Sequence, residues 1–254
     1  MRLRFAHAAL FAAALSHGSS VRADAEPEPS ALATLAAGTG VGQRQVHVPA
    51  RRGELQLDSG SFAALDVRLA GEVVSGSWVF GAQAHYQTSL GVEATTTPPN
   101  GVAKQTSLRL HHLDFGLDAG LRFSEAPGAV NVRLFAGWAF RGLRPVIDLD
   151  IPPYTLHGPV LRLELRVPIA GLVALRIAPE LFVLAHVSNE LRHAADSASA
   201  GIALGVEIDL ELKLSRRVFA VLGYRESRAR VGTAWDTPIA DDERFMTGSL
   251  GLRY

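Results

Sequence analysis

The sequence predicts an all-β protein, a closed antiparallel up-and-down transmembrane β-barrel of about ten strands, with eight or twelve strands as alternatives. Apolar residues recur at every second position over long stretches, as in strands with one apolar face. The intervals between these stretches alternate between short and long, which is typical of outer-membrane barrels. No apolar run reaches the length of about 18 residues that a membrane helix needs.

The clearest strand is the stretch GIALGVEIDLELKL, residues Gly201–Leu214. Its even positions are all large and aliphatic: Ile202, Leu204, Val206, Ile208, Leu210, Leu212 and Leu214. Its odd positions are small or charged: Gly201, Ala203, Gly205, Glu207, Asp209, Glu211 and Lys213. A soluble barrel would place long solvated side chains on its polar face, whereas small residues suit a crowded interior. We therefore predict that the aliphatic face contacts lipid and that the other face lines the lumen.

The same alternation marks the other strands, which are longer than the five or six residues usual in soluble proteins. The predicted strands are 31–46, 61–74, 77–91, 107–123, 129–144, 158–169, 172–187, 199–214, 218–231 and 244–254. Long connections are predicted near 47–60, 92–106, 145–157, 188–198 and 232–243. An even number of strands closes the sheet without an unpaired edge, as a hydrocarbon environment requires.

The predicted lumen contains charges of both signs. The cations assigned to it are Arg68, Arg122, Arg133, Arg162, Arg166, Arg176, Lys213 and Arg253. The anions assigned to it are Asp66, Glu72, Asp114, Asp118, Glu164, Glu180, Glu207, Asp209 and Glu211. Buried charges persist when they are paired, so we expect a salt-bridged lumen. Ten strands are too few for a wide channel, and a narrow pore stays open as a possibility.

The chain divides into three parts. Residues 1–23 have a basic start, a short apolar run and small residues before a cleavage site, which predicts a signal peptide. Residues 24–30 form a flexible lead-in, and residues 31–254 form the barrel domain. Lysine and arginine total 25, equal to aspartate and glutamate, so no basic excess favours nucleic acid. There is no cysteine to supply disulfides.

Aromatic residues and the last strand complete the pattern. Trp78, Phe123, Phe219 and Tyr254 lie beside the predicted short turns, and Tyr86, Trp138 and Phe140 lie toward the long connections, as two interfacial girdles would. The chain ends in FMTGSLGLRY, an amphipathic strand with a terminal aromatic residue. On these features it resembles the small barrels of the outer-membrane β-barrel superfamily of Gram-negative bacteria. The resemblance implies export to the outer membrane, insertion by the barrel-assembly machinery, and contact with outer-membrane lipids and lipopolysaccharide. We expect a monomer.

Two short patterns point to enzymes of this membrane. HVSN, residues 186–189, resembles the corresponding stretch of lipid A deacylase barrels, which would make His186 a base and Ser188 a nucleophile. Strand alternation predicts that both point inward, although a lipid-cleaving site should face the bilayer. Ten strands also match the omptin proteases, which use acidic pairs and an Asp/His pair at the rim. The candidate residues for such a site are Asp241, Asp242, Asp148, Asp150 and His157.

The remaining motifs favour structural roles. Gly38, Gly40 and Gly42 superficially resemble a phosphate loop but share one face of a predicted strand, where they would leave lumen space. Adjacent residues on a strand point to opposite faces, so His111 and His112 cannot simply chelate one metal. These two histidines, together with His186 and His193, are interpreted as rim residues.

The sequence thus predicts no catalytic residue, no cofactor-binding residue and no metal ligand. The predicted function is that of a non-enzymatic structural or surface protein of the outer membrane, or of a narrow pore. The alternatives are an outer-membrane hydrolase that uses His186 and Ser188, and a soluble periplasmic barrel that binds an apolar ligand.

Overall fold

The computed structural model describes residues 31–50, 53–97, 101–124, 129–146, 154–187, 201–232 and 239–254. The predicted signal peptide and lead-in lie outside these residues. The strands are β1 (Ala31–Ala50), β2 (Gly53–Ser75), β3 (Trp78–Ser89), β4 (Val92–Thr97), β5 (Lys104–Arg122), β6 (Asn131–Pro145), β7 (Tyr154–Ala170), β8 (Val173–Val187), β9 (Gly201–Lys213), β10 (Val218–Val231) and β11 (Ile239–Arg253). No helix among the described residues is long and apolar enough to cross a membrane.

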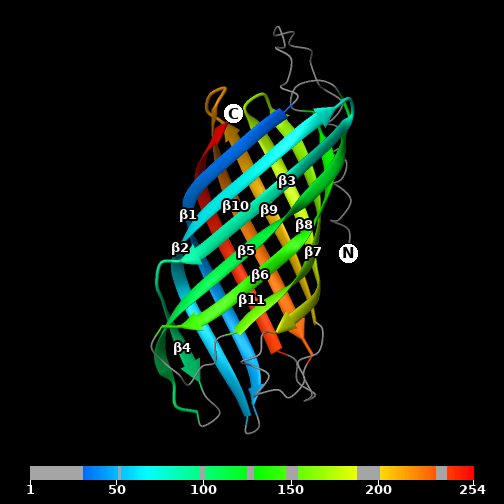
Figure 1. The fold of residues 1–254 in the computed structure, drawn as a ribbon. Coiled ribbons are helices and arrows are strands. Elements are labelled where there is room, and N and C mark those ends of the chain that lie inside the picture. Colours follow the sequence, from blue (N-terminus) through cyan, green and yellow to red (C-terminus); the bar gives the residue numbers. More distant parts are fainter. Residues whose placement is uncertain are drawn as a thin grey trace, which may run out of the picture.

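The sheet closes on itself. Each strand pairs antiparallel with its neighbours, and β1 pairs with both β2 and β11, which joins the first strand to the last (Figure 1). The barrel therefore has no free edge. Both β3 and β4 pair with β2 on one side and with β5 on the other. Strand β4 therefore continues β3 beyond a break at Gly91. The fold is a ten-stranded barrel with one extra strand, as predicted.

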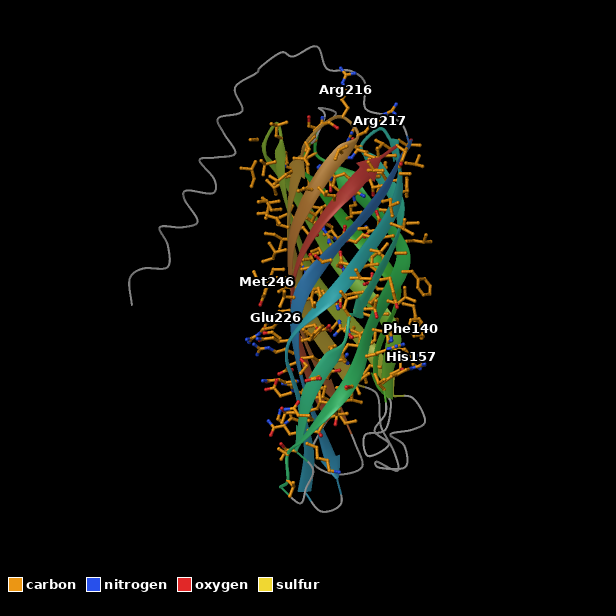
Figure 2. The ribbon with its side chains drawn as sticks, turned by 90° about the vertical axis from the view of Figure 1, so that its left-hand side faces the viewer. Phe140, His157, Arg216, Arg217, Glu226 and Met246 are labelled. Atoms are coloured by element: carbon orange, nitrogen blue, oxygen red, sulfur yellow. The ribbon has the colours of Figure 1, made fainter. Side chains whose placement is uncertain are left out.

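Over most of its length the barrel is apolar outside and polar inside. In β9, the side chains of Leu204 and Ile208 are 61% and 39% exposed, whereas Glu207 and Asp209 are each 4% exposed. Figure 2 shows side chains projecting from the wall all around the barrel, with Met246 among them. We call this part, with its apolar outer face, the membrane segment. The predicted orientation of the aliphatic face is confirmed.

The polarity reverses toward the end that carries the long connections. Within the unbroken strand β5, Leu108 and Leu110 are buried inside, while Ser107 and Arg109 are exposed outside. Past His111 and His112 the pattern inverts, and Phe115 is exposed. We call the part with a polar outer face and an apolar interior the external segment. Its exposed polar residues are Gln43, Gln45, Gln56, Asp58, Ser61, Glu93, Lys104, Gln105, Ser107, Arg109, Arg144, Arg228, Arg230 and Arg244.

This reversal explains why several predicted connections are wrong. The stretches near 47–60, 92–106, 145–157 and 232–243 are partly strand, and β1 and β2 continue to Ala50 and from Gly53. Their apolar residues face the interior instead of lipid, so they break the alternation that identified the membrane strands. The sequence also predicts short connections at 75–77, 124–128, 170–171 and 215–217. Those at 75–77, 170–171 and 215–217 are confirmed as turns between strands, and residues 125–128 lie outside the described part of the structure.

A bulge in β2 accommodates the reversal on that strand. The register with β1 shifts between Gln43 and Gln45, so that Ser59 and Gly60 both lie opposite Arg44. Gly60 has a φ of 55°, a left-handed conformation that side chains other than glycine adopt with difficulty. Because the bulge inserts one residue, Leu57 and Ser59 point inward at odd positions, and Phe62 points inward at an even one.

Aromatic residues mark both ends of the membrane segment. At the end with short turns, Trp78 is 53%, Phe123 is 68% and Tyr254 is 70% exposed, as expected of an interfacial girdle. Phe219 is an exception to the prediction, since it is buried inside the barrel, where the Arg253 guanidinium lies 5.2 Å from its ring centre. At the other end, Tyr86 and Trp138 are exposed as predicted.

Candidate functional site

The centre of the lumen is a network of ion pairs. Arg68 Nη1 of β2 lies 2.8 Å from carboxylate oxygens of both Glu207 and Asp209 of β9. Arg176 Nη2 of β8 reaches the same two carboxylates, at 2.7 and 2.6 Å. Arg176 Nη1 lies 3.0 Å from Glu164 of β7. The contacts of Arg68 cross the barrel between non-neighbouring strands, whereas those of Arg176 join neighbouring strands.

A second set of contacts extends the network toward the external segment. Arg162 Nη2 lies 2.9 Å from Glu180 and 3.3 Å from Asp114. Arg141 Nη2 lies 2.7 Å from the other oxygen of Glu180. Arg162 also stacks over Phe135, with its guanidinium carbon 4.8 Å from the ring centre. All four charged residues are nearly inaccessible to solvent, which is tolerable because each lies against an opposite charge.

At the other end of the membrane segment the pairs are more exposed. Arg253 Nη2 lies 2.5 Å from Glu211, which also lies 3.3 Å from Arg166. Arg133 Nη2 lies 2.6 Å from Glu72. The predicted salt-bridged lumen is present, although Lys213 is exposed at the end of β9. Sequence reasoning missed the lumenal residues Arg44, His85, His112, Arg141, Arg225, Asp241 and Glu243, which lie where the alternation changes phase.

His85, His112 and Asp114 form the one group among the described residues that could ligate a metal ion. His85 Nε2 lies 2.6 Å from Asp66, and His112 Nε2 lies 2.9 Å from Asp114. Arg225 donates to His112 Nδ1 at 2.6 Å, so Nε2 is the nitrogen that carries the proton and donates to Asp114. These hydrogen bonds occupy the would-be ligand atoms.

The charge around this group also disfavours a divalent cation. Arg162 lies beside Asp114, Arg225 beside His112 and Arg68 beside Asp66. A metal ion would meet guanidinium groups on several sides and would have to displace the existing contacts. His112 is therefore a structural lumenal residue and not the rim residue predicted from the sequence. His111 points to the opposite face, as predicted.

A cluster of buried apolar side chains closes the lumen in the external segment. We call it the apolar cap. Its residues are Val46, Leu57, Phe62, Ala64, Val92, Ala94, Leu108, Leu110, Phe135, Ala139, Leu143, Leu156, Val160, Phe182, Ala203, Ala229, Val231, Ile239 and Phe245. Phe62 and Phe245 are in ring contact, with centres 6.0 Å apart. Arg44 lies among these apolar side chains and reaches Asp241 and the Gly142 carbonyl oxygen, so the cap encloses a buried ion pair.

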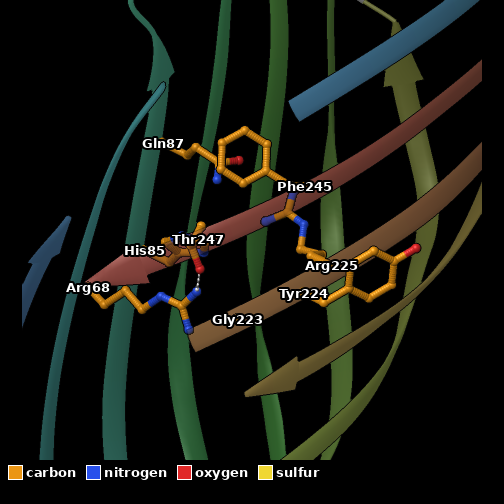
Figure 3. Close-up of a pocket in the computed structure, with 8 residues that line it drawn as sticks. All are labelled: Arg68, His85, Gln87, Gly223, Tyr224, Arg225, Phe245 and Thr247. Carbon is orange, nitrogen blue, oxygen red and sulfur yellow. Dashed lines mark hydrogen bonds between the residues drawn. The ribbon is translucent and has the colours of Figure 1, made fainter. Parts of the chain in front are cut away.

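Beneath the cap, a small cavity separates it from the ion-pair network. Arg68, His85, Arg225, Phe245 and Thr247 contribute to its walls (Figure 3). Its space of about 10 Å³ is at the lower limit for holding one water molecule. It is too small for an organic ligand, whose pocket usually measures a few hundred Å³ or more.

The lumenal glycines of β1 make room for aromatic rings and not for an open passage. A Cβ atom at Gly42 would collide with the rings of Phe245 and Phe62, and one at Gly40 would collide with Phe245. This corrects the expectation that Gly38, Gly40 and Gly42 leave lumen space. Their shared face is confirmed, because a Cβ at Gly38 would meet Ser249 on β11.

The residues proposed for a deacylase site are only partly described. His186 lies opposite His157 in the pairing of β8 with β7, while Ser188 lies outside the described residues. An irregularity between Val183 and Ala185 interrupts the alternation on β8. The side chain of His186 lies outside the described part of the structure, so its inward orientation stays a prediction.

The three described residues proposed for an omptin-like site, Asp241, Asp242 and His157, do not come together. Asp241 is buried in the lumen and is bound by Arg44, at 2.9 and 2.6 Å. Asp242 pairs with Arg230 on the outer face. The ring of His157 stacks on Phe140 outside the barrel, with centres 5.7 Å apart. Asp148, Asp150 and His193 lie outside the described residues.

Known structures provide a direct comparison. The chain is similar to the outer membrane protease OmpT from Escherichia coli, with 12% identity, a TM-score of 0.55 and coverage of 90% of this chain and 97% of OmpT. The fold is that of an outer-membrane β-barrel. At this identity the similarity concerns the fold alone.

Other solved structures match with lower TM-scores. The translocator domain of the autotransporter NalP from Neisseria meningitidis has 10% identity and a TM-score of 0.43, and covers 98% of this chain and 96% of that domain. The attachment invasion locus protein Ail of Yersinia pestis has 8% identity and a TM-score of 0.36, and covers 89% of this chain and all of Ail. No protein-family model matches the sequence. A search of curated proteins finds no match either.

Proposed function

We propose that this protein is a closed, non-enzymatic barrel of the outer membrane that displays its external segment and long connections at the cell surface. The observation that carries the proposal is that two sets of side chains, the ion pairs and the apolar cap, fill the lumen. Ion pairs cross the membrane segment, and the apolar cap covers them from the outside. A conducting pore needs a continuous water-filled path, and in this barrel buried side chains fill the lumen along both segments.

A planar-bilayer recording of the refolded protein tests this proposal. We expect no discrete conductance steps at voltages where a porin refolded in the same way conducts. A matched variant, Phe62→Ala with Phe245→Ala, removes two rings from the apolar cap. If the cap is the seal, small currents should arise in the variant and not in the native protein. Discrete steps in the native protein would contradict a closed barrel and favour the narrow pore.

The absence of enzymatic activity is part of the same proposal. Its support is that Asp241 is neutralised by Arg44 and that His157 is stacked on aromatic rings, away from any described carboxylate pair. Substituting Ser188→Ala should leave lipid A acylation unchanged in cells that express the protein. If a lipid A species with fewer acyl chains were lost on this substitution, the deacylase alternative would be favoured.

The proposed partners follow from the location. We propose that the outer face contacts outer-membrane lipids and lipopolysaccharide, and that the terminal strand β11 is recognised by the barrel-assembly machinery during insertion. We propose a monomer that binds no nucleic acid. The soluble alternative predicts recovery in the aqueous fraction without detergent, whereas a membrane barrel requires detergent and migrates differently on gels after heating.

A further inference from the structure

Two arginines face each other on the outside of the barrel. Arg109 of β5 and Arg144 of β6 are directly opposite in the strand register, and both are exposed. Like charges in directly opposite positions of a sheet destabilise it. Neither arginine forms a salt bridge with a described acidic residue, and Glu93 of the neighbouring strand lies opposite Ser107 instead. The pair therefore has an electrostatic cost that nothing described in the barrel offsets.

Polar groups surround this pair on the membrane side. His111 follows Arg109 on the same face of β5, and its Nδ1 lies 3.0 Å from Thr88 Oγ1 and 3.2 Å from Tyr86 Oη. Opposite His111 stands Gly142, which has no side chain of its own. A Cβ atom there would come within 3.6 Å of Thr155 Oγ1. The two guanidinium groups thus stand above a patch of neutral hydrogen-bonding groups.

Aromatic rings lie immediately below these polar groups. Phe115 stacks on Phe140 with ring centres 6.3 Å apart, and Phe140 stacks on His157. Trp138 lies 6.1 Å from His157. Such rings mark the level at which hydrocarbon gives way to lipid headgroups. In Figure 2, Phe140 and His157 lie far from Arg216 and Arg217, which belong to a short turn at the other end of the membrane segment.

The opposite side of the barrel provides an internal comparison. There, Arg228 and Arg244 share the carboxylate of Glu226 at 2.9 and 3.5 Å, and Arg230 pairs with Asp242. Glu226 lies beside the lipid-facing Met246 in Figure 2, across the barrel from Phe140. The arginines at that position pair with acidic side chains of the barrel, whereas Arg109 and Arg144 pair with no acidic side chain among the described residues.

We propose that Arg109 and Arg144 bind the phosphate group on the headgroup of an outer-leaflet lipid. The inference rests on the proposed outer-membrane location. Guanidinium groups bind phosphate through paired charge-assisted hydrogen bonds, and two of them suit a dianionic phosphate monoester. The acyl chains of the same lipid would extend along Phe115 and Phe140 toward the centre of the membrane segment.

The test is lipid retention, measured by native mass spectrometry on the refolded full chain. The probes are a lipid A carrying phosphate monoesters and the same lipid after removal of its phosphates. The variant is Arg109→Gln with Arg144→Gln. The matched control is Arg228→Gln with Arg244→Gln, which removes the same charge from the paired side. Heat-modifiable gel migration verifies that each variant is folded.

We expect the native protein and the control to retain the phosphorylated lipid preferentially, and the Arg109/Arg144 variant to retain it roughly thirtyfold less, from about one kcal/mol per arginine at a membrane surface. Equal retention of the two lipids by the native protein would overturn the proposal, as would an equal loss in both variants. Displacement of the lipid by millimolar inorganic phosphate would identify a site for free anions and overturn the lipid assignment. Conductance in bilayers would overturn the proposed function without affecting this result.

Discussion

Arg44 of β1 and Asp241 of β11 form a bidentate ion pair inside the barrel, with Nε 2.9 Å from Oδ1 and Nη2 2.6 Å from Oδ2. The two residues are 197 positions apart in the sequence. Their side chains are 1% and 4% exposed. Arg44 also donates to the Gly142 carbonyl oxygen at 3.3 Å, so it links the closing strands to β6 across the lumen.

Removing one member of this pair should destabilise the barrel strongly. Arg44→Met leaves the Asp241 carboxylate buried without its counterion, which typically costs about 3–5 kcal/mol of unfolding free energy. Denaturant titration in detergent micelles measures the change. The double variant Arg44→Met with Asp241→Leu removes both charges and should recover most of the loss. Equal destabilisation by single and double variants would show that packing, and not the uncompensated charge, dominates.

A charge on the outer face should be costly only within the membrane segment. Leu117 of β5 is 69% exposed and faces outward between the two girdles. Leu117→Arg should lower the free energy of unfolding in lipid vesicles by about 2–4 kcal/mol, the range for positions near the bilayer midplane. Ser107→Arg lies on the same face of the same strand but in the external segment, and it should change the free energy by less than about 1 kcal/mol. Similar costs at both positions would refute the proposed boundary.

The lumenal glycines should not tolerate larger residues. Gly42→Leu would force side-chain atoms into the rings of Phe62 and Phe245, and overpacking of this kind costs about 1–3 kcal/mol. Gly71 of β2 provides the control, since it is exposed and a Cβ atom there meets nothing within 4 Å. Gly71→Ala should therefore be neutral or slightly stabilising in the same titration. A neutral Gly42→Leu would indicate a looser apolar cap than described.

The bulge in β2 should depend on Gly60. Its positive φ makes a substitution by alanine cost of order 1–3 kcal/mol, although a Cβ atom would contact nothing nearby. Asparagine tolerates this conformation better, so Gly60→Asn should cost less than Gly60→Ala. The temperature at which the folded gel band converts to the unfolded band ranks the two variants by stability. The reverse ranking would mean that the backbone conformation at this position is not what requires glycine.

The sequence predicts the membrane segment well because the membrane imposes one rule on every strand. A lipid-facing side chain must be apolar, so Gly201–Leu214 and its counterparts alternate regularly, and ten strands could be counted from that pattern. For the external segment the sequence predicts loops, because the apolar residues there occupy the opposite face. In β5 the change of phase falls between His111 and His112, so the sequence does carry a local signal of the reversal.

Alternation by itself thus determined which faces meet lipid, because that choice is made locally, two residues at a time. Only the tertiary structure decided which lumenal charges are partners. Arg68 meets Asp209 because closure of the barrel places β2 and β9 on opposite sides of the lumen, and Arg44 meets Asp241 because closure pairs β1 with β11. The register shift at Gly60 and the apolar cap are also decided by the tertiary structure. Each depends on which residues of neighbouring strands lie opposite one another.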